Sequence, residues 1–407
     1  MKKTEEEKYI HKRKLKALRE SLVYRMCHVF PVKSNKIVMW TFEGGGGYAC
    51  SPKYIAEEIL RRNELGQTDY VIYWLVKDMN KSFPDGIIKV KDSIWNRAYH
   101  LSTARFWVSN TRTFLGTFKR KETTYIQTWH GSISLKPIGK LRGNLFSKMA
   151  YIVSESDSDL MDYAISGSRW CTKMWPDGLV YNGKILEIGS PRCDVLIDSV
   201  KEKHEQLRME YHIPKDAKIC LYAPTFRGGS QDTKRSVNTE PVSIDFIRLI
   251  STLEKCFGGT WYVFLRLHPQ LAAQLEELPV SAKNDRMIDV SQRPDMAEIM
   301  AATDCIITDY STVIFEGFLT GQPGFIYADD LDEYVADRGK LMFDLDEIPF
   351  TVARDNDTLM KNIESFNKER YEITRTEFIK KTGIVEDGHA SERVVDLIEN
   401  KSGASCF

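Results

Sequence analysis

The feature that most constrains the fold of this 407-residue chain is an alternation of short apolar runs with amphipathic stretches. Between residues 36 and 189, the run Val71–Val76 is typical of a buried strand, and the stretch Pro52–Arg62 is typical of a helix. A second alternation begins near residue 219 and includes the strand-like run Trp261–Leu265. Strands separated by helices favour parallel βαβ units. We therefore predict an α/β protein of two doubly wound, Rossmann-like domains that face a central cleft.

The same pattern divides the chain into segments. Residues 197–215 are charged and contain Pro214, which suits a linker or a connecting helix between the two alternations. The predicted segments are an N-terminal segment (1–30), a first Rossmann-like domain (31–200), a second (201–375) and a C-terminal helical segment (376–407).

Residues 1–30 predict a basic amphipathic helix. Leu15, Leu18, Leu22 and Met26 recur at helical spacing among many lysines and arginines. Such a helix can lie on anionic lipid, where each nearby Lys or Arg contributes roughly 1 kcal/mol. Alternatively, the apolar stripe packs on the protein and the charges are solvated. The glutamates at 5–7 dilute the basic face, and the sequence leaves both interpretations open.

Composition excludes several classes of protein. Lys+Arg and Asp+Glu both number 57, so no global charge draws the chain to nucleic acid. The eight cysteines form no C-x-x-C pair, which favours free thiols in a reducing compartment over a zinc or redox motif. No apolar run approaches about 18 residues, so no transmembrane helix is expected. The first residues do not resemble a signal peptide, and we expect a cytosolic protein.

Polar residues that follow the apolar runs are candidate site residues, because open α/β sheets bind ligands outside the carboxyl ends of their strands. His130 follows the run Tyr125-Ile126, between Trp129 and Gly131. An imidazole with an ordinary pKa near 6.5 can act as general base on an acceptor hydroxyl. The alternative is a histidine that caps a loop.

Arg266 and His268 follow the second-half run Trp261–Leu265. Alternation along a strand places both side chains on one side. Together they suit a diphosphate, since a guanidinium matches the spacing of phosphate oxygens. A salt-bridged arginine beside a turn histidine is the alternative.

Ser311 and Thr312 stand where a helix is expected to begin, after Ile306-Ile307 and before an apolar body from Val313 to Leu319. A helix N-terminus offers free N–H groups and a partial positive charge to a phosphate. Glu316, about one turn later, can accept hydrogen bonds from ribose hydroxyls. The alternative for Ser311 and Thr312 is simple N-capping, which is compatible with phosphate binding.

Two further features carry weaker signals. Pro224 and Thr225 follow the first strand of the second half, in a turn that can face a nucleobase, with Arg227 within reach of phosphate. Asp329, Asp330 and Asp332 are acidic residues of the kind that commonly cap or solvate a strand end. We expect no metal site and no cofactor.

Five segments in this order resemble the CDP-glycerol glycerophosphotransferase family of teichoic acid primases and polymerases, and the resemblance covers roughly residues 36 to 395. The matching segments are Thr128-Trp129-His130-Gly131, Gly189-Ser190-Pro191-Arg192-Cys193-Asp194, Tyr222-Ala223-Pro224-Thr225-Phe226-Arg227, Arg266-Leu267-His268-Pro269 and Ile307-Thr308-Asp309-Tyr310-Ser311-Thr312.

The resemblance implies a GT-B fold, with 31–200 as the acceptor-side domain and 201–375 as the CDP-glycerol-binding domain. It implies transfer of glycerol phosphate to a lipid-linked or polymeric acceptor, with release of CMP, at the inner face of the cytoplasmic membrane. It implies His130 as the base and His268 as a second catalytic residue. The implied donor-binding residues are Trp129, His130, Gly131, Arg192, Pro224, Thr225, Arg266, His268, Ser311, Thr312 and Glu316.

The sequence departs from the family pattern at three places. The run His130-Gly131-Ser132-Ile133-Ser134-Leu135-Lys136 is one residue longer than usual, Thr312 replaces a serine, and Glu316 replaces an aspartate. The donor can therefore carry glycerol or ribitol, and the product can be one unit or many. Two rival functions stay open: a GT-B transferase that uses a sugar nucleotide, and a non-catalytic scaffold that binds polymer at a membrane.

Overall fold

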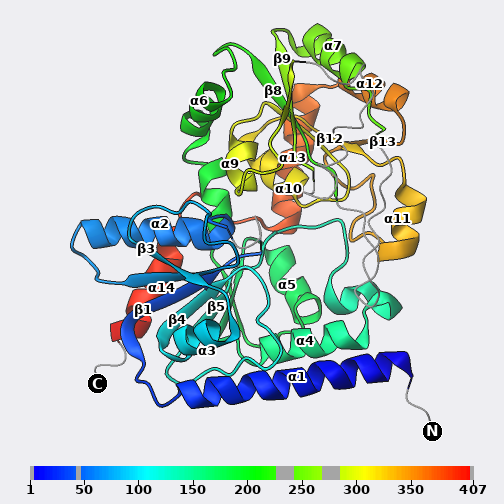
Figure 1. Ribbon diagram of the computed structural model, residues 1–407. Helices are drawn as coiled ribbons and strands as arrows, with labels where there is room; N and C mark the ends of the chain where they lie inside the picture. The colour runs from blue at the N-terminus through cyan, green and yellow to red at the C-terminus, as the bar shows by residue number, and fades with distance from the viewer. Residues whose placement is uncertain (1–3, 43–46, 226–242, 268–284, 404–407) are drawn as a thin grey trace.

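The computed structural model describes residues 4–42, 47–225, 243–267 and 285–403 and has two lobes, one above the other in Figure 1. Each lobe is built on one parallel sheet with helices around it. The predicted architecture of two doubly wound α/β halves is confirmed.

The first lobe contains a seven-stranded sheet of order β3-β2-β1-β4-β5-β6-β7. Its strands are β1 (Lys33–Trp40), β2 (Val71–Val76), β3 (Ile87–Lys91), β4 (Ala104–Ser109), β5 (Thr124–Gln127), β6 (Tyr163–Ser166) and β7 (Lys184–Glu187). Its helices are α1 (Glu5–Cys27), α2 (Cys50–Glu64), α3 (Ile94–Ser102), α4 (Lys148–Ser158), α5 (Arg169–Gly178) and the 3-10 segments η2 (Gly139–Leu145) and η3 (Pro191–Leu196).

The second lobe contains a six-stranded sheet of order β10-β9-β8-β11-β12-β13. Its strands are β8 (Lys218–Tyr222), β9 (Trp261–Leu265), β10 (Met287–Asp289), β11 (Cys305–Thr308), β12 (Gly324–Tyr327) and β13 (Thr351–Ala353). Its helices are α6 (Val200–Glu210), α7 (Phe246–Phe257), α9 (Met296–Ala301), α10 (Val313–Gly317) with the 3-10 turn η6 (Phe318–Thr320), α11 (Leu331–Arg338), α12 (Asn356–Glu364) and α13 (Lys368–Thr382).

Both sheets reverse their strand order at one point, and these two points position the functional residues. The first sheet reverses between β1 and β4, and the second between β8 and β11. At such a point the loops after the two neighbouring strands leave in opposite directions and open a crevice at the carboxyl edge.

The C-terminal segment differs from the prediction. The boundary expected at residue 375 falls inside α13, because nothing breaks the helix before Gly383, which ends it with a left-handed φ of +64°. The chain then returns to the first lobe, where α14 (Ala390–Gly403) packs on α2 and Arg62 pairs with Asp396 and Glu399. Figure 1 shows α14, in red, beside β1 in the lower lobe.

Helix α1 packs on the first lobe through Tyr24 and Cys27, which are buried. The apolar stripe of the sequence faces the other way: Leu15, Leu18 and Leu22 are 45%, 61% and 53% exposed. The interpretation in which this stripe packs on the protein is therefore wrong. Figure 1 shows α1 along the bottom of the first lobe, with the second lobe at the top. Within the described residues, no helix is both long enough and apolar enough to cross a bilayer.

A buried ion cluster joins the two lobes. Lys53 of α2 is 5% exposed, and its Nζ lies 2.7 Å from Glu298 Oε1 of α9 and 3.2 Å from Asp295 Oδ2. Burial alone lowers the pKa of Lys53, but the carboxylates of Asp295 and Glu298 outweigh burial and raise it. The charged form is therefore favoured at the interface.

We predict that Lys53→Ala lowers the free energy of unfolding by roughly 3 kcal/mol, since it leaves the buried carboxylate of Asp295 without its cation. Urea denaturation measures the change. The matched control is Lys255→Ala, which removes an ion pair to Glu364. Both side chains of this pair are exposed, so its loss should leave the urea midpoint close to that of wild type. Equal effects of the two variants would contradict a role of Lys53 in joining the lobes.

Candidate functional site

The reversal point of the second sheet brings together two of the predicted segments. Thr225, after β8, donates from its backbone N–H to Asp309 Oδ1 (2.8 Å), and its hydroxyl donates to the same oxygen (2.5 Å). The loop of Pro224 and Thr225 therefore lies beside the loop of Ser311 and Thr312. Asp309 therefore bridges the loop after β8 and the loop after β11. Its position directly after a strand could have identified it as a site residue.

Helix α10 begins after Thr312, as the sequence predicts, but it is shorter than expected. It ends at Gly317 and continues as the 3-10 turn η6, which Gly321 closes with a φ of +80°. Ser311 Oγ accepts a long hydrogen bond from Val313 N (3.4 Å), while the Thr312 side chain makes no capping bond. Simple N-capping therefore explains Ser311 only weakly.

His130 lies in the loop after β5, at the carboxyl edge of the first sheet. Its Nδ1 is 2.7 Å from the carbonyl oxygen of Asn110, and its ring packs on Trp129 and Phe42. A carbonyl can only accept, so Nδ1 carries the proton and Nε2 of the neutral ring has a free lone pair. This tautomer is the one that a general base requires.

Burial lowers the pKa of His130 to about 4, and the nearby positive charges of Lys136, Arg192 and Arg112 act in the same direction. The hydrogen bond to Asn110 opposes the shift without reversing it. His130 is therefore neutral throughout the physiological pH range.

Arg192 connects the loops of both lobes. This side chain is 3% exposed, and its Nη1 donates to the His130 carbonyl and contacts Cys50 Sγ, both at 3.2 Å. Its Nη2 lies 3.3 Å from Glu316 Oε2 of α10. Arg192, predicted as a donor-site residue, thus lies directly between His130 and the helix that follows Thr312.

The lobes also meet at Gly131. A Cβ at this position would lie 3.0 Å from Thr312 Cγ2 and 3.1 Å from Thr312 Oγ1. A larger side chain would push the two loops apart. The absence of a side chain at Gly131 therefore lets the histidine loop of the first lobe touch the second-lobe edge.

Arg266 and Glu316 both contact other groups of the protein. The Arg266 guanidinium donates to the carbonyls of Val290 (2.9 Å), Ser291 (2.6 Å) and Arg293, so it braces the loop after β10. Glu316 has no exposed surface and pairs with Arg192. Contacts of Arg266 with a diphosphate and of Glu316 with a ribose stay predictions. His268, like Arg227, lies outside the described residues.

Sequence reasoning missed Asn110 and Phe42. The amide oxygen of Asn110 accepts from Phe42 N (2.9 Å), and the Phe42 ring packs on His130 with 5.2 Å between ring centroids. Asn110 follows β4 directly, so its place at a strand end was the available signal. Within the described ranges, no group of three His, Cys, Asp or Glu side chains could hold a metal ion.

The sequence of this chain is similar to those of two known bacterial proteins. The chain is 31% identical to a teichoic acid poly(glycerol phosphate) polymerase of Staphylococcus epidermidis, over 90% of this chain and 51% of the polymerase. It is 28% identical to a teichoic acid glycerol-phosphate transferase of Staphylococcus aureus, over 95% of this chain and 99% of the transferase. The chain thus spans about half the length of the polymerase and nearly all of the transferase.

The solved structure of the wall teichoic acid polymerase TagF superposes with a TM-score of 0.80 at 28% identity, covering 98% of this chain and 99% of that one. This likeness confirms the predicted GT-B fold. The family model described as CDP-Glycerol:Poly(glycerophosphate) glycerophosphotransferase matches residues 22–400. Because this family model matches nearly the whole chain, the chain belongs to the CDP-glycerol:poly(glycerophosphate) glycerophosphotransferase family.

Proposed function

We propose that this chain transfers glycerol phosphate from CDP-glycerol to a hydroxyl of a lipid-linked or polymeric teichoic acid-type acceptor and releases CMP. The observation that carries the proposal is the junction of the lobes, where the neutral His130 stands beside Gly131, and Gly131 touches Thr312. Both relatives described above are named for glycerol phosphate, and this supports glycerol over ribitol as the transferred alditol.

The proposed step is a phosphoryl transfer. The acceptor hydroxyl oxygen attacks the β-phosphorus of CDP-glycerol, and the bond from this phosphorus to the bridging oxygen breaks, so that CMP leaves. The hydroxyl proton passes to Nε2 of His130. Such reactions depend on positioning and on stabilisation of charge more than on covalent catalysis.

The second-lobe edge is the proposed donor site. Pro224, Thr225, Ser311 and Thr312 border the crevice in which nucleotides bind to doubly wound sheets. Arg266 contributes a positive charge near this edge from its fixed place beside the 290–293 loop. Arg192 and Glu316 fix the histidine loop relative to α10.

The test is a donor comparison with the purified chain. CDP-glycerol, CDP-ribitol and UDP-sugars are each incubated with a synthetic lipid-linked acceptor, and release of CMP or UDP is followed with and without EDTA. We expect CMP release from CDP-glycerol that EDTA does not reduce. Preference for another donor, or acceptor binding without any turnover, would favour the rival transferase or the scaffold. The length of the product separates a single addition from polymerisation.

We predict that His130→Ala lowers the rate of transfer by at least 10²-fold, the lower range of general-base catalysis, while CDP binding stays within a few-fold of wild type. Calorimetric titration measures the binding. The matched control is His389→Ala, which removes a histidine that is 54% exposed and should leave transfer unchanged. A His130→Ala enzyme within tenfold of wild type would exclude the role.

The pKa of His130 predicts an unusual pH profile. A base with an ordinary pKa near 6.5 would be mostly protonated at pH 5.5. Because the pKa of His130 is lowered to about 4, its neutral form persists at pH 5.5 and is lost only as the pH falls through about 4. We expect kcat/KM at pH 5.5 to exceed half its value at pH 7.5. A tenfold loss between these two pH values would contradict this assignment.

We further propose that the chain is cytoplasmic and lies peripherally on the inner face of the cell membrane through α1. The exposed stripe of Leu15, Leu18, Leu22 and Met26 supports this placement. Exposed basic side chains lie three or four residues, about one helical turn, from the leucines of the stripe: Lys12 and Arg19 on one side, and Lys14 and Arg25 on the other. An apolar stripe bordered by lysine and arginine suits the surface of an anionic bilayer.

Replacing Leu15, Leu18 and Leu22 together by Ser should weaken binding to vesicles that contain anionic lipid by at least tenfold, because roughly 1 kcal/mol of apolar burial is lost per leucine. Vesicle sedimentation measures the binding. The control is the triple replacement of Met209, Ile247 and Ile373 by Ser, which removes exposed apolar side chains from the second lobe. Unchanged vesicle binding in the leucine variant would refute the placement.

A further inference from the structure

Trp129, which directly precedes the histidine of the proposed reaction, has a left-handed backbone conformation. Its φ is +55°, in a region that residues other than glycine rarely adopt. A bulky residue stays in such a conformation only where its surroundings impose it. The contacts that impose it on Trp129 therefore also set the direction in which the chain continues into His130.

The side chain of Gln127 makes one of these contacts. Gln127 is the last residue of β5 and is 1% exposed. Its Oε1 accepts a hydrogen bond from the Trp129 N–H at 3.0 Å. Its Nε2 donates to the Thr111 carbonyl at 3.0 Å and to the Tyr125 hydroxyl at 2.8 Å. Because both ends of the amide are bonded, the amide has one orientation and holds the Trp129 N–H in one place.

A buried carboxylate ends this network of hydrogen bonds. Asp157 of α4 is 1% exposed, and its Oδ1 accepts from the Tyr125 hydroxyl at 3.1 Å. The same oxygen accepts from the N–H and from the hydroxyl of Thr113, both at 2.8 Å. The network therefore runs from Asp157 through Tyr125 and Gln127 to the backbone of Trp129.

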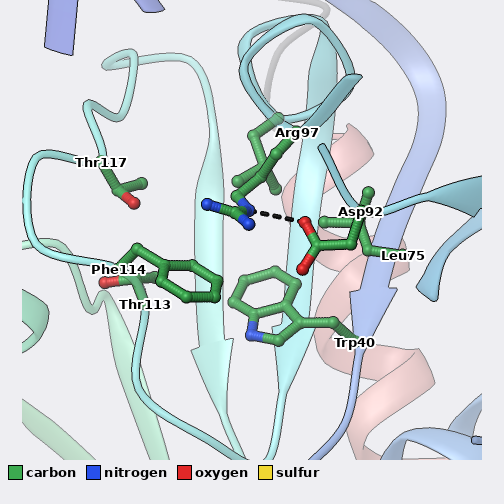
Figure 2. Close-up of a pocket in the computed structure, with 8 residues that line it drawn as sticks. Trp40, Leu75, Asp92, Arg97, Thr113, Phe114 and Thr117 are labelled. Carbon is green, nitrogen blue, oxygen red and sulfur yellow. Dashed lines mark hydrogen bonds and ion pairs between the residues drawn. The ribbon is translucent and has the colours of Figure 1, made fainter. Parts of the chain in front are cut away.

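The network has little room to rearrange. The Tyr125 ring stacks on Trp40 with 5.8 Å between ring centroids. Trp40 and Thr113 also line the cavity of Figure 2, whose volume of about 20 Å³ holds roughly one water molecule. In this cavity the Nε of Arg97 lies 2.7 Å from Asp92 Oδ1. Closely packed side chains of this kind pass a displacement on to their neighbours instead of absorbing it.

The other end of the network meets the catalytic ring. The rings of Trp129 and His130 are stacked with 4.3 Å between centroids, and the Arg112 guanidinium lies 4.8 Å from the centre of the Trp129 ring. The Nδ1 of His130 donates to the Asn110 carbonyl at 2.7 Å. Asn110 and Arg112 belong to the segment 110–113 after β4, whose other two residues bond to the network. One short segment therefore fixes the network and the imidazole relative to each other.

We propose that Gln127 is a positioning residue, which directs the imidazole of His130 through the strained backbone of Trp129. In this orientation Nδ1 faces the Asn110 carbonyl, and Nε2 stays available to an acceptor hydroxyl. The inference rests on the proposed function, because it supplies the orientation that this reaction requires of its base. Gln127 is buried, so it acts on the reaction only through Trp129, and the Tyr125 hydroxyl orients its amide.

The primary test observes the imidazole directly, so it does not depend on turnover. Wild-type chain and Gln127→Leu are labelled with nitrogen-15 histidine and titrated by NMR, and the His130 signals are identified by their loss in His130→Ala. In wild type we expect a single tautomer, with the proton on Nδ1, and no titration above about pH 5.

In Gln127→Leu we expect a mixture of tautomers of His130 and a titration midpoint at least about one pH unit higher than in wild type. Burial is the largest cause of the low pKa of His130, and a ring that is no longer held in place becomes more hydrated. Loss of the hydrogen bond to Asn110 acts in the opposite direction and is the smaller effect.

The matched control is Asn63→Leu. The Asn63 amide accepts from the Tyr70 N–H and donates to the Tyr70 carbonyl, so this variant loses the same kind of bonds in the same lobe. These bonds lie just before β2, at the opposite end of the strands from His130. We expect Asn63→Leu to unfold at a lower temperature with the tautomer and midpoint of His130 unchanged. A wild-type His130 in folded Gln127→Leu, or the same change in Asn63→Leu, would overturn the proposal.

A milder variant guards against misfolding. Tyr125→Phe keeps the ring that stacks on Trp40 and removes only the hydroxyl between Gln127 and Asp157. We expect the same changes in His130, with smaller amplitude. If Gln127→Leu does not fold, an unchanged His130 in Tyr125→Phe overturns the proposal by itself.

Transfer assays separate this proposal from the function on which it rests. In Gln127→Leu we expect kcat to fall at least about tenfold, with KM for CDP-glycerol within a few-fold of wild type, since the base is misdirected and the donor edge is intact. A wild-type chain that shows the expected tautomer but transfers nothing would refute the proposed function and leave the positioning intact. Transfer by Gln127→Leu at the wild-type rate would refute the positioning alone.

Discussion

The geometry of the site depends on one buried guanidinium. Arg192 lies between the lobes, donates to the carbonyl of His130 and pairs with Glu316 of α10. A buried charge is tolerated only when its partners are in place, so this side chain couples the position of the histidine loop to that of the helix after Thr312. Lys53, Asp295 and Glu298 act on the same interface further along α2 and α9.

The reversal points of the two sheets share one local hydrogen-bonding arrangement. In the first sheet, the N–H of Phe42, after β1, donates to the side chain of Asn110, after β4. In the second sheet, the N–H of Thr225, after β8, donates to Asp309, after β11. In both sheets, an Asn or Asp that follows one strand thus accepts a hydrogen bond from the loop that follows the neighbouring strand. In each lobe a short polar bridge fixes the spacing of the two loops, and the two lobes meet near Gly131 and Thr312.

One loop of the first lobe links α1 to His130. Thr117 lies 3.4 Å from the Tyr24 hydroxyl of α1, and the carbonyl of Asn110 accepts the Nδ1 proton of His130. A shift of α1 would therefore be transmitted to His130 through few contacts. This arrangement favours coupling between attachment of α1 to a surface and catalysis at His130.

The sequence by itself determined the local elements and the chemistry of the motifs. The runs Val71–Val76 and Trp261–Leu265 became β2 and β9, because a buried parallel strand needs a continuous apolar run. His130, Arg192, Thr225 and Thr312 could be selected because they follow strands. Only the tertiary structure decided which of them meet, because contacts between residues far apart in sequence leave no local pattern. Tertiary packing also buried Glu316 against Arg192, turned Arg266 toward the 290–293 carbonyls and left the leucines of α1 exposed.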